Sequence, residues 1–336
     1  MIGSFFRSIL TELNIQIYKQ GKNMANNAAA ILTGSTSGST LTRDVFLEIK
    51  EAFDRSNIFL PLIEVKTISE GHGAQFIIGG KDSSTLAKTM GRSGATTELG
   101  NDISVNPVKL DQRLINIDDL VYDARRIDGK EEKMLAFDVR GPITNMIGTV
   151  LSQNIDLKIV AKLGLAAEGT GLADNPNAGA VVVNAVITSG TSAKAKGDAL
   201  AESIFEAVAE LKANDNYNQP VVAVGPKEYA YLVQSGNGVN ADYTSGNGGY
   251  DKGTIMMVGG AKVVQTNHLS AATNIEGLKA LVFTKEAVGL VKLQDLTTEV
   301  NYDFNKFATL MTGRFAIGVG ILRPECCVAI SSSVQS

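Results

Sequence analysis

The chain has 336 residues, of which 44% are hydrophobic and 20% charged, and its formal net charge at pH 7 is −4. This balance is typical of a globular protein of about two domains, and it argues against broad electrostatic capture of nucleic acid. No apolar run reaches the length of about eighteen residues that a membrane-spanning helix needs. Cys326 and Cys327 are neighbours and cannot join distant segments, as expected of a chain made in a reducing cytoplasm.

The N-terminal segment combines apolar side chains at near-helical spacing with a break at Arg7 and Glu12 that leaves no signal-peptide core. These apolar residues are Phe5, Phe6, Ile9, Leu10, Leu13 and Ile17. The segment fits a helix at a membrane surface or, as we favour, a helix that docks on a neighbouring subunit. In a third interpretation, residues 1–23 are a leader and Met24 opens the usual form of the protein. Residues 25–40 are small, polar and glycine-rich, which predicts a flexible arm.

A projecting loop is predicted after the arm. Thr42 is expected to cap a helix, and residues 62–68 and 74–78 then have strand patterns that we expect to form a hairpin. Residues 79–107 contain few large apolar groups, so they cannot form a core of their own. Because residues 108–117 alternate apolar and polar side chains and can pair with 74–78, we expect an extended two-stranded loop that projects from the body.

The longest uninterrupted helical signal covers residues 141–169. Gly141 and Pro142 open it as an N-cap followed by a proline at the first helical position. Apolar residues at spacings of three and four form one stripe along the helix, while Asp156 and other polar residues occupy the remaining positions. The stripe consists of Ile143, Met146, Ile147, Val150, Leu151, Ile155, Ile159 and Leu163. At about 1.5 Å per residue the helix spans roughly 40 Å, so it can act as a spine to which sheets attach.

A smaller unit of strands and helices is predicted after the spine. Its strand patterns lie at 180–187, 219–224, 254–258, 261–265 and 279–284. Leu200, Ile204, Val208 and Leu211 form the stripe of a second amphipathic helix. A shorter helix is expected to start at Pro226, and Gly259-Gly260 fits a two-residue hairpin turn. Alternating apolar residues at 315–321 then predict a return to strands.

The titratable residues offer no catalytic constellation. His72 and His268 lie at predicted turns far apart in the sequence, and a zinc site would need carboxylates beside both. Cys326 and Cys327 fall in an apolar strand without a histidine nearby, which favours buried inert thiols over a nucleophile. We predict no catalytic, cofactor-binding or metal-binding residue and no cofactor.

Two glycine-rich runs fail as nucleotide-binding motifs. The run GGK at 79–81 is not a phosphate loop, because Gln75 stands where the first glycine should be. The run GNGG at 246–249 follows no convincing strand, so it is not a dinucleotide-binding fingerprint. Asp118 and Asp119 are more simply solvated charges at a strand end than an acid–base pair.

Five short runs carry a family resemblance. They are GAQF at 73–76, FDVR at 137–140, the run 253–269, AVGLVKLQDL at 287–296 and GILRPE at 320–325. Each run is weak alone, whereas the ordered set covers about residues 42–330 and is specific. Together with the order of arm, loop, spine, glycine-looped unit and closing strands, the set resembles the HK97-like major capsid proteins of tailed phages, in particular those of T7-like podoviruses.

The resemblance implies an α+β fold with an N-terminal arm, an extended E-loop, a P-domain built on the spine helix, and an A-domain. The implied limits are 1–67 for the arm, 68–117 for the E-loop, 118–196 for the P-domain with the spine helix at 141–168, 197–288 for the A-domain, and 289–336 for the P-domain return strands and C-terminus. It also implies a non-enzymatic major capsid protein that assembles as hexamers and pentamers into an icosahedral shell around phage double-stranded DNA.

The implied partners are further copies of the chain, a separate scaffolding protein, a portal protein and packaged DNA as non-specific content, with no membrane. Scaffolding is expected in trans because arm and loop already use the residues before the spine. The protein would be assembled in the host bacterial cytoplasm and remain in the virion. Some members of this fold cross-link through a lysine and an asparagine, but no motif singles out Lys81 or Lys88 in the loop, so we expect no cross-link.

Two other hypotheses stay open at this point. An encapsulin-type bacterial nanocompartment resembles the same fold, although the extended arm and the closing segment favour the virus. A soluble α/β enzyme is the alternative from a different class, and the lack of a credible catalytic set counts against it.

Overall fold

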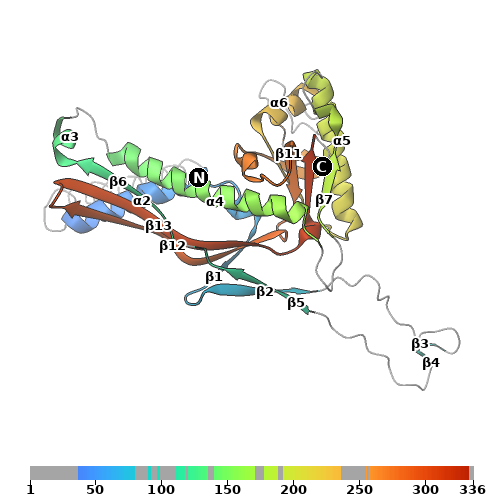
Figure 1. The fold of residues 1–336 in the computed structure, drawn as a ribbon, viewed down its shortest axis with the longest axis horizontal. Coiled ribbons are helices and arrows are strands. Elements are labelled where there is room, and N and C mark those ends of the chain that lie inside the picture. The colour runs from blue at the N-terminus through green and yellow to red at the C-terminus, as the bar shows by residue number, and fades with distance from the viewer. Residues whose placement is uncertain are drawn as a thin grey trace, which may run out of the picture.

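The computed structural model describes residues 37–79, 90–91, 97–98, 110–118, 120–134, 140–170, 178–187, 192–235, 255 and 257–332. Within them, two larger β-sheets occupy different parts of an elongated body, and one long helix runs from the first sheet to the second (Figure 1). This helix, α4 (Arg140–Ala167), begins and ends within about two residues of the predicted spine. The predicted spine helix is confirmed.

The first sheet has four strands in the order β1-β12-β13-β6. They are β1 (Glu64–Thr67), β12 (Val288–Asp303), β13 (Ala308–Ile321) and β6 (Val121–Asp128). β12 and β13 form a long antiparallel ribbon that ends in a turn at 304–307, and the short helix α3 (Gly129–Met134) follows β6. The alternating apolar residues at 315–321, which predict a return to strands near the end of the sequence, lie in β13.

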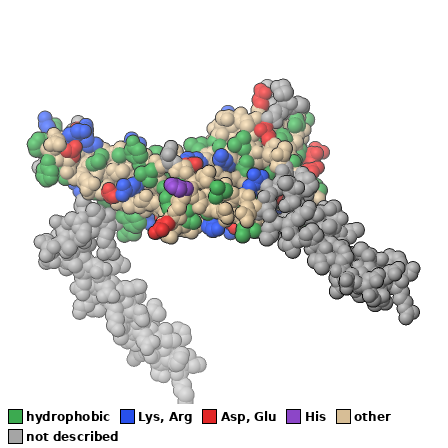
Figure 2. Space-filling view, turned by 60° about the horizontal axis from the view of Figure 1, so that its bottom comes forward, with side chains coloured by type: hydrophobic (Ala, Val, Ile, Leu, Met, Phe, Trp, Pro, Cys, Tyr) green, Lys and Arg blue, Asp and Glu red, His purple; other side chains and the backbone are tan. Residues whose placement is uncertain are grey.

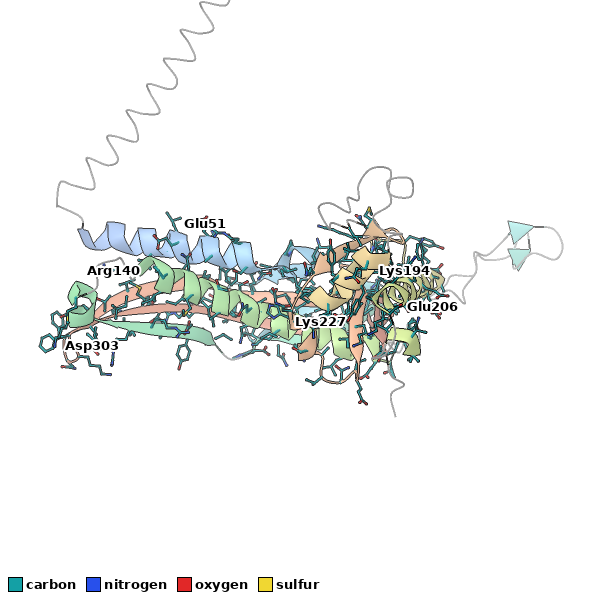
Figure 3. All side chains as sticks on the ribbon, turned by 90° about the horizontal axis from the view of Figure 1, so that it is seen from above. Glu51, Arg140, Lys194, Glu206, Lys227 and Asp303 are labelled. Atoms are coloured by element: carbon teal, nitrogen blue, oxygen red, sulfur yellow. The ribbon has the colours of Figure 1, made fainter. Side chains whose placement is uncertain are left out.

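Two helices lie side by side over one face of the first sheet, α4 and α2 (Ser37–Ser56) (Figure 3). Val45, Ile49 and Phe53 of α2 are buried in the same cluster as the inward stripe of α4. The helices meet closely at Gly148, where a Cβ atom would lie 2.5 Å from the carbonyl oxygen of Ile49, so only glycine fits. The cluster supplies the hydrophobic free energy of this end of the body, at about 25 cal/mol per Å² of buried apolar surface.

The second sheet has six strands in the order β7-β14-β11-β8-β10-β9. They are β7 (Ala180–Val183), β14 (Cys327–Ser331), β11 (Leu278–Phe283), β8 (Val221–Val224), β10 (Ala261–Gln265) and β9 (Met257–Val258). The helices α5 (Ala193–Ala213) and α6 (Pro226–Ser235) cover one face, while α4 and the turn η3 (His268–Ala271) cover the other. In β8, Val222 and Val224 pack toward α5, whereas Val221 and Ala223 pack toward α4.

The predictions for this second unit are largely confirmed. α5 buries the stripe Leu200, Ile204, Val208 and Leu211, and α6 begins at Pro226. β9 and β10 form the predicted hairpin around Gly259-Gly260, both of which have positive φ angles. The strand predicted for 180–187 is shorter, because a 3-10 turn, η2 (Ala185–Ile187), follows β7.

Three placements differ from those predicted. The predicted hairpin of 62–68 with 74–78 is wrong, because β1 pairs in parallel with β12, at the edge of the four-stranded sheet. The C-terminal strand β14, expected with the P-domain return strands, lies inside the six-stranded sheet, where its apolar side chains are covered on both faces. α2 and β1, expected in the arm, belong to the body around the first sheet.

The buried stripe of α4 is also narrower than predicted. Met146 and Val150 are exposed, because α2 and the sheet cover only one side of the helix, whereas Ile147 and Ile155 are buried as expected. The prediction that Asp156 lies on the polar side is wrong, since its side chain is fully buried.

Asp156 holds the loop that leads from α2 to β1. Its carboxylate accepts hydrogen bonds from the backbone N–H groups of Ile58, at 3.1 Å, and Phe59, at 3.3 Å. Phe59 in turn packs against Phe283 of the second sheet, with ring centroids 6.1 Å apart. Burial raises the pKa of Asp156, and the two hydrogen bonds and the nearby His268 partly oppose the rise. The loop is thus fastened to the middle of α4 and to both sheets.

Asp156→Ala should lower the free energy of unfolding at pH 7 by about 1–3 kcal/mol, because two buried N–H groups lose their acceptor. Since the folded state holds the carboxyl proton more tightly than the unfolded chain, the wild-type protein should lose stability as pH rises above 3.8, the ordinary pKa. The variant should lack that loss. Urea unfolding followed by circular dichroism measures both effects, with the exposed Asp54→Ala as control. Equal midpoints for the two variants would contradict the role of Asp156.

Candidate assembly surfaces

A two-stranded ribbon leaves the body beside the first sheet. It consists of β2 (Gly73–Gly79) and β5 (Leu110–Asn116), which pair antiparallel as predicted. Its inner face, with Phe76 and Ile115, is buried against Val291 and Leu322 of the body. Farther along the chain, the short strands β3 (Met90–Gly91) and β4 (Thr97–Glu98) lie well away from the body (Figures 1 and 3). This geometry confirms the predicted pairing of the two strands, whereas most of the predicted projection, residues 80–89, 92–96 and 99–109, lies outside the described residues.

The outer face of the β2–β5 ribbon presents two large apolar side chains to solvent. Ile77 is 66% exposed and Leu114 is 60% exposed, and polar neighbours such as Gln75 and Gln112 surround them. A subunit gains nothing by exposing such residues on a ribbon that already has a buried face. The outer face therefore has the composition of a contact surface.

The root of the ribbon is held firmly. The N–H of Asp118 donates to the carbonyl of Ile317 at 3.0 Å, so the end of β5 is tied directly to β13. A Cβ atom at Gly318 would clash with the carbonyl oxygen of Asn116, so this close approach requires glycine. On the other side, Ile68 donates its N–H to the carbonyl of Lys292 in β12 at 2.9 Å. These contacts fix the direction in which the ribbon leaves the body.

A second exposed apolar cluster lies at the tip of the β12–β13 ribbon. Tyr302 and Phe304 form an edge-to-face pair 5.0 Å apart, and Phe304 and Phe307 are 78% and 72% exposed. Phe307 has a φ angle of +48°, an uncommon conformation for a bulky residue. Met134 of α3 is exposed as well. Figure 3 shows Asp303 of this tip at the extreme end of the body, opposite to β3 and β4.

The sequence analysis missed this tip cluster. A signal was present, because the run YDFNKF at 302–307 combines three aromatic residues with turn-forming Asp303 and Asn305. A turn between two strands is too short to bury three aromatic side chains within the subunit. Such a run therefore indicates contact with another molecule.

Charges of both signs are interspersed on the surface seen in Figure 2. Elsewhere in the described residues, Arg314 pairs with Glu299 at 2.5 Å and Lys158 with Asp118 at 3.0 Å. Asp118 is thus an ion-paired charge at the end of a strand, and Asp119 lies outside the described residues. This surface lacks the broad basic face that binding to a nucleic acid duplex requires.

The two cysteines are buried thiols, as predicted. Asn216 donates from its Nδ2 to the Sγ of Cys326 at 3.0 Å, and the Sγ of Cys327 lies 3.4 Å from the carbonyl oxygen of Leu163. Burial raises the pKa of Cys326 to about 11 and also raises that of Cys327. Neutral thiols without a base nearby are poor nucleophiles.

The remaining candidates for chemistry are not brought together. His72 is exposed before β2, and His268 begins η3 beside the second sheet. Among the described residues, no three His, Cys, Asp or Glu side chains are placed to hold a metal ion. Gly80, Lys81 and Lys88 and the run 246–249 lie outside those residues. In the same part of the chain, no helix has the length and apolar character needed to cross a membrane.

Comparison with known proteins explains why the subunit exposes apolar surfaces. The sequence model of the family described as Gp10A-like major capsid protein matches residues 86–331, most of the chain. The chain belongs to this family. It is 26% identical to the major capsid protein of Escherichia phage T7 over 348 aligned positions, covering 94% of this chain and 98% of that protein. It is also 26% identical to the major capsid protein of Enterobacteria phage T3 over 330 positions, covering 84% and 88% of the two chains.

A solved structure agrees with this membership. The capsid structure of Cyanophage P-SCSP1u is 29% identical and superposes with a TM-score of 0.66, covering 83% of this chain and 89% of that one. The predicted HK97-like α+β capsid fold is confirmed. The chain is a phage major capsid protein, a structural protein that forms the shell of the virion, and not an enzyme. The nanocompartment and the soluble enzyme are thereby disfavoured.

Both thiols should be unreactive in the native protein at pH 8, because burial keeps them protonated. Titration with a disulfide reagent should detect fewer than about 0.1 thiol per chain before unfolding and both thiols in guanidinium chloride. Rapid reaction of the folded subunit would contradict the burial of Cys326 and Cys327.

Leu114→Asp should leave the subunit folded, with a change in unfolding free energy within about 0.5 kcal/mol, because the residue is on the surface. It should nevertheless abolish shell formation, because it inserts a charge into an apolar contact. The adjacent Ile115→Asp is the matched control. That residue is buried, so its substitution should destabilise the subunit by several kcal/mol. Circular dichroism and electron microscopy separate the two outcomes, and normal shells from Leu114→Asp would refute the contact.

Proposed function

We propose that this capsid protein assembles as hexamers and pentamers into an icosahedral shell that encloses phage double-stranded DNA. The observation that supports this best is the presence of two separate exposed apolar surfaces on one subunit. These are the outer face of the β2–β5 ribbon and the aromatic tip of the β12–β13 ribbon. One copy cannot bury both, so each copy needs at least two different neighbours, as a closed lattice provides.

We further propose a division of labour among the parts of the chain. The E-loop, residues 68–117, lies over a neighbouring subunit, and an arm formed by the first residues runs beneath another. The P-domain comprises α4, α2 and the four-stranded sheet. The A-domain comprises the six-stranded sheet, including β14, with α5 and α6, and it meets its copies around the axis of the capsomer. The separation of the described elements into two sheets supports this division.

A separate scaffolding protein is part of the proposal. Hexamers and pentamers of one chain must close with different curvature, and identical contacts alone do not set how often a pentamer is inserted. A scaffold supplies that control in trans. A portal protein is the other expected partner, in keeping with the resemblance to T7-like capsid proteins.

Packaged DNA is proposed as non-specific content of the shell. The net charge of −4 suits an inner wall that does not grip DNA, because binding to duplex DNA relies on lysine and arginine contacts with phosphates. Assembly would take place in the host bacterial cytoplasm before packaging.

Expressed alone, the chain should give capsomers, tubes or shells of mixed diameter, because the curvature is not controlled. Addition of the phage's scaffolding protein should narrow these particles to a single size. Electron micrographs and sedimentation profiles of the two preparations provide the measurement. Uniform shells of the correct size from the lone chain would contradict scaffolding in trans and would revive the nanocompartment reading.

A further inference from the structure

The outer face of α5 has a surface that the isolated subunit leaves without a partner. Phe205 is 59% exposed at one edge of this face, where its ring lies beside Gly259 of the β9–β10 turn. Glu202 and Glu210 lie four residues before and after Glu206, and both are exposed. An exposed aromatic residue beside a row of carboxylates is more typical of a protein contact than of an ordinary solvated helix face.

The charges of this face destabilise the free subunit. Glu202, Glu206 and Glu210 follow one another at i, i+4 spacing, where like charges repel. Within the described part of the chain, no lysine or arginine forms an ion pair with any of the three. The repulsion is relieved when a cation from another molecule approaches the face.

A positive charge lies on the neighbouring helix, α6. Lys227 is exposed in the first turn of α6, where the helix dipole disfavours a positive charge. No carboxylate of the described ranges forms an ion pair with it, whereas the next residue, Glu228, lies 3.9 Å from Lys279. α5 and α6 pack on each other over the same face of the sheet, and Figure 3 shows Lys227 and Glu206 at opposite edges of this pair of helices. Both charges are therefore available to different neighbours at the same time.

We infer that the acidic face of α5 in one copy receives the Lys227 side of α6 from the next copy around the capsomer. This inference rests on the proposed ring of A-domains. A ring requires head-to-tail contacts, in which one side of a subunit meets the opposite side of the following one. Opposite charges on the two sides favour that order and disfavour contact between like sides. Glu202, Glu206 and Glu210 supply the charges of the contact, and Phe205 supplies apolar surface at its edge.

A charge exchange tests the contact. Glu206→Lys should leave the subunit as stable as the wild type or slightly more stable, since it replaces repulsion within α5 by attraction. The same change should reduce the assembled fraction at least about tenfold, because each contact around the ring then opposes two positive charges. Adding Lys227→Glu to the same chain should restore assembly to within about threefold, because the charges are exchanged and opposite again.

Assembly is measured by sedimentation and electron microscopy of the purified chain, with unfolding followed by circular dichroism. Glu51→Lys, on the exposed side of α2 (Figure 3), is the control for charge reversal. It removes only an exposed ion pair with Arg55 at 2.6 Å and should assemble within about twofold of the wild type. About 1 M salt should narrow the deficit of Glu206→Lys, because the Debye length falls to about 3 Å. Wild-type assembly of Glu206→Lys, or a double variant that does not recover, would overturn the contact. A wild-type chain that stays monomeric would instead contradict the proposed function itself.

Discussion

The simultaneous burial of α4 against two sheets is the constraint on which the rest of the structure depends. Toward its N-terminus the helix packs on β13, with Ile147 and Leu151 above Gly313, and toward its C-terminus Leu163 reaches Cys327 of β14. One continuous cluster therefore contains residues of α2, α4 and both sheets. Because the core is shared and close-packed, neither sheet can shift without disturbing the other. The exposed ribbon and the aromatic tip keep a fixed relation to each other for this reason.

The sequence predicted elements whose signal is local and missed those whose partners are remote. The period of α4 and α5 could be seen in the sequence because each helix buries one stripe along its own length. The partner of β1 could not be predicted, because β12 follows more than two hundred residues later. The side-chain pattern of an edge strand does not identify the strand with which it pairs. Asp156 looked like a surface residue for a related reason. Its role depends on two backbone N–H groups whose position is set by the tertiary fold.

The candidate surfaces were predicted less completely than the fold. A loop without large apolar residues predicts a projection, and the pairing of β2 with β5 confirms the two strands expected at its base. The sequence does not show, however, whether an apolar residue in a strand faces its own core or another molecule. Only the structure shows that Leu114 is exposed and Ile115 is buried. The aromatic residues of the 302–307 turn and Phe205 of α5 illustrate the same point. Such residues are exposed in the folded subunit, and they become buried only when several subunits assemble.

The rigid attachment of the β2–β5 ribbon has a consequence for closure of the shell. Hydrogen bonds to Ile317 and Lys292 and the close approach at Gly318 hold the root of the ribbon on the first sheet. If hexamers and pentamers use the same subunit, the change in angle must therefore be absorbed between copies. Packed apolar contacts depend steeply on geometry, whereas the attraction between opposite charges falls off slowly with distance and tolerates rotation. A charged rim on α5 facing Lys227 of the next copy suits a ring that must close with either five or six members.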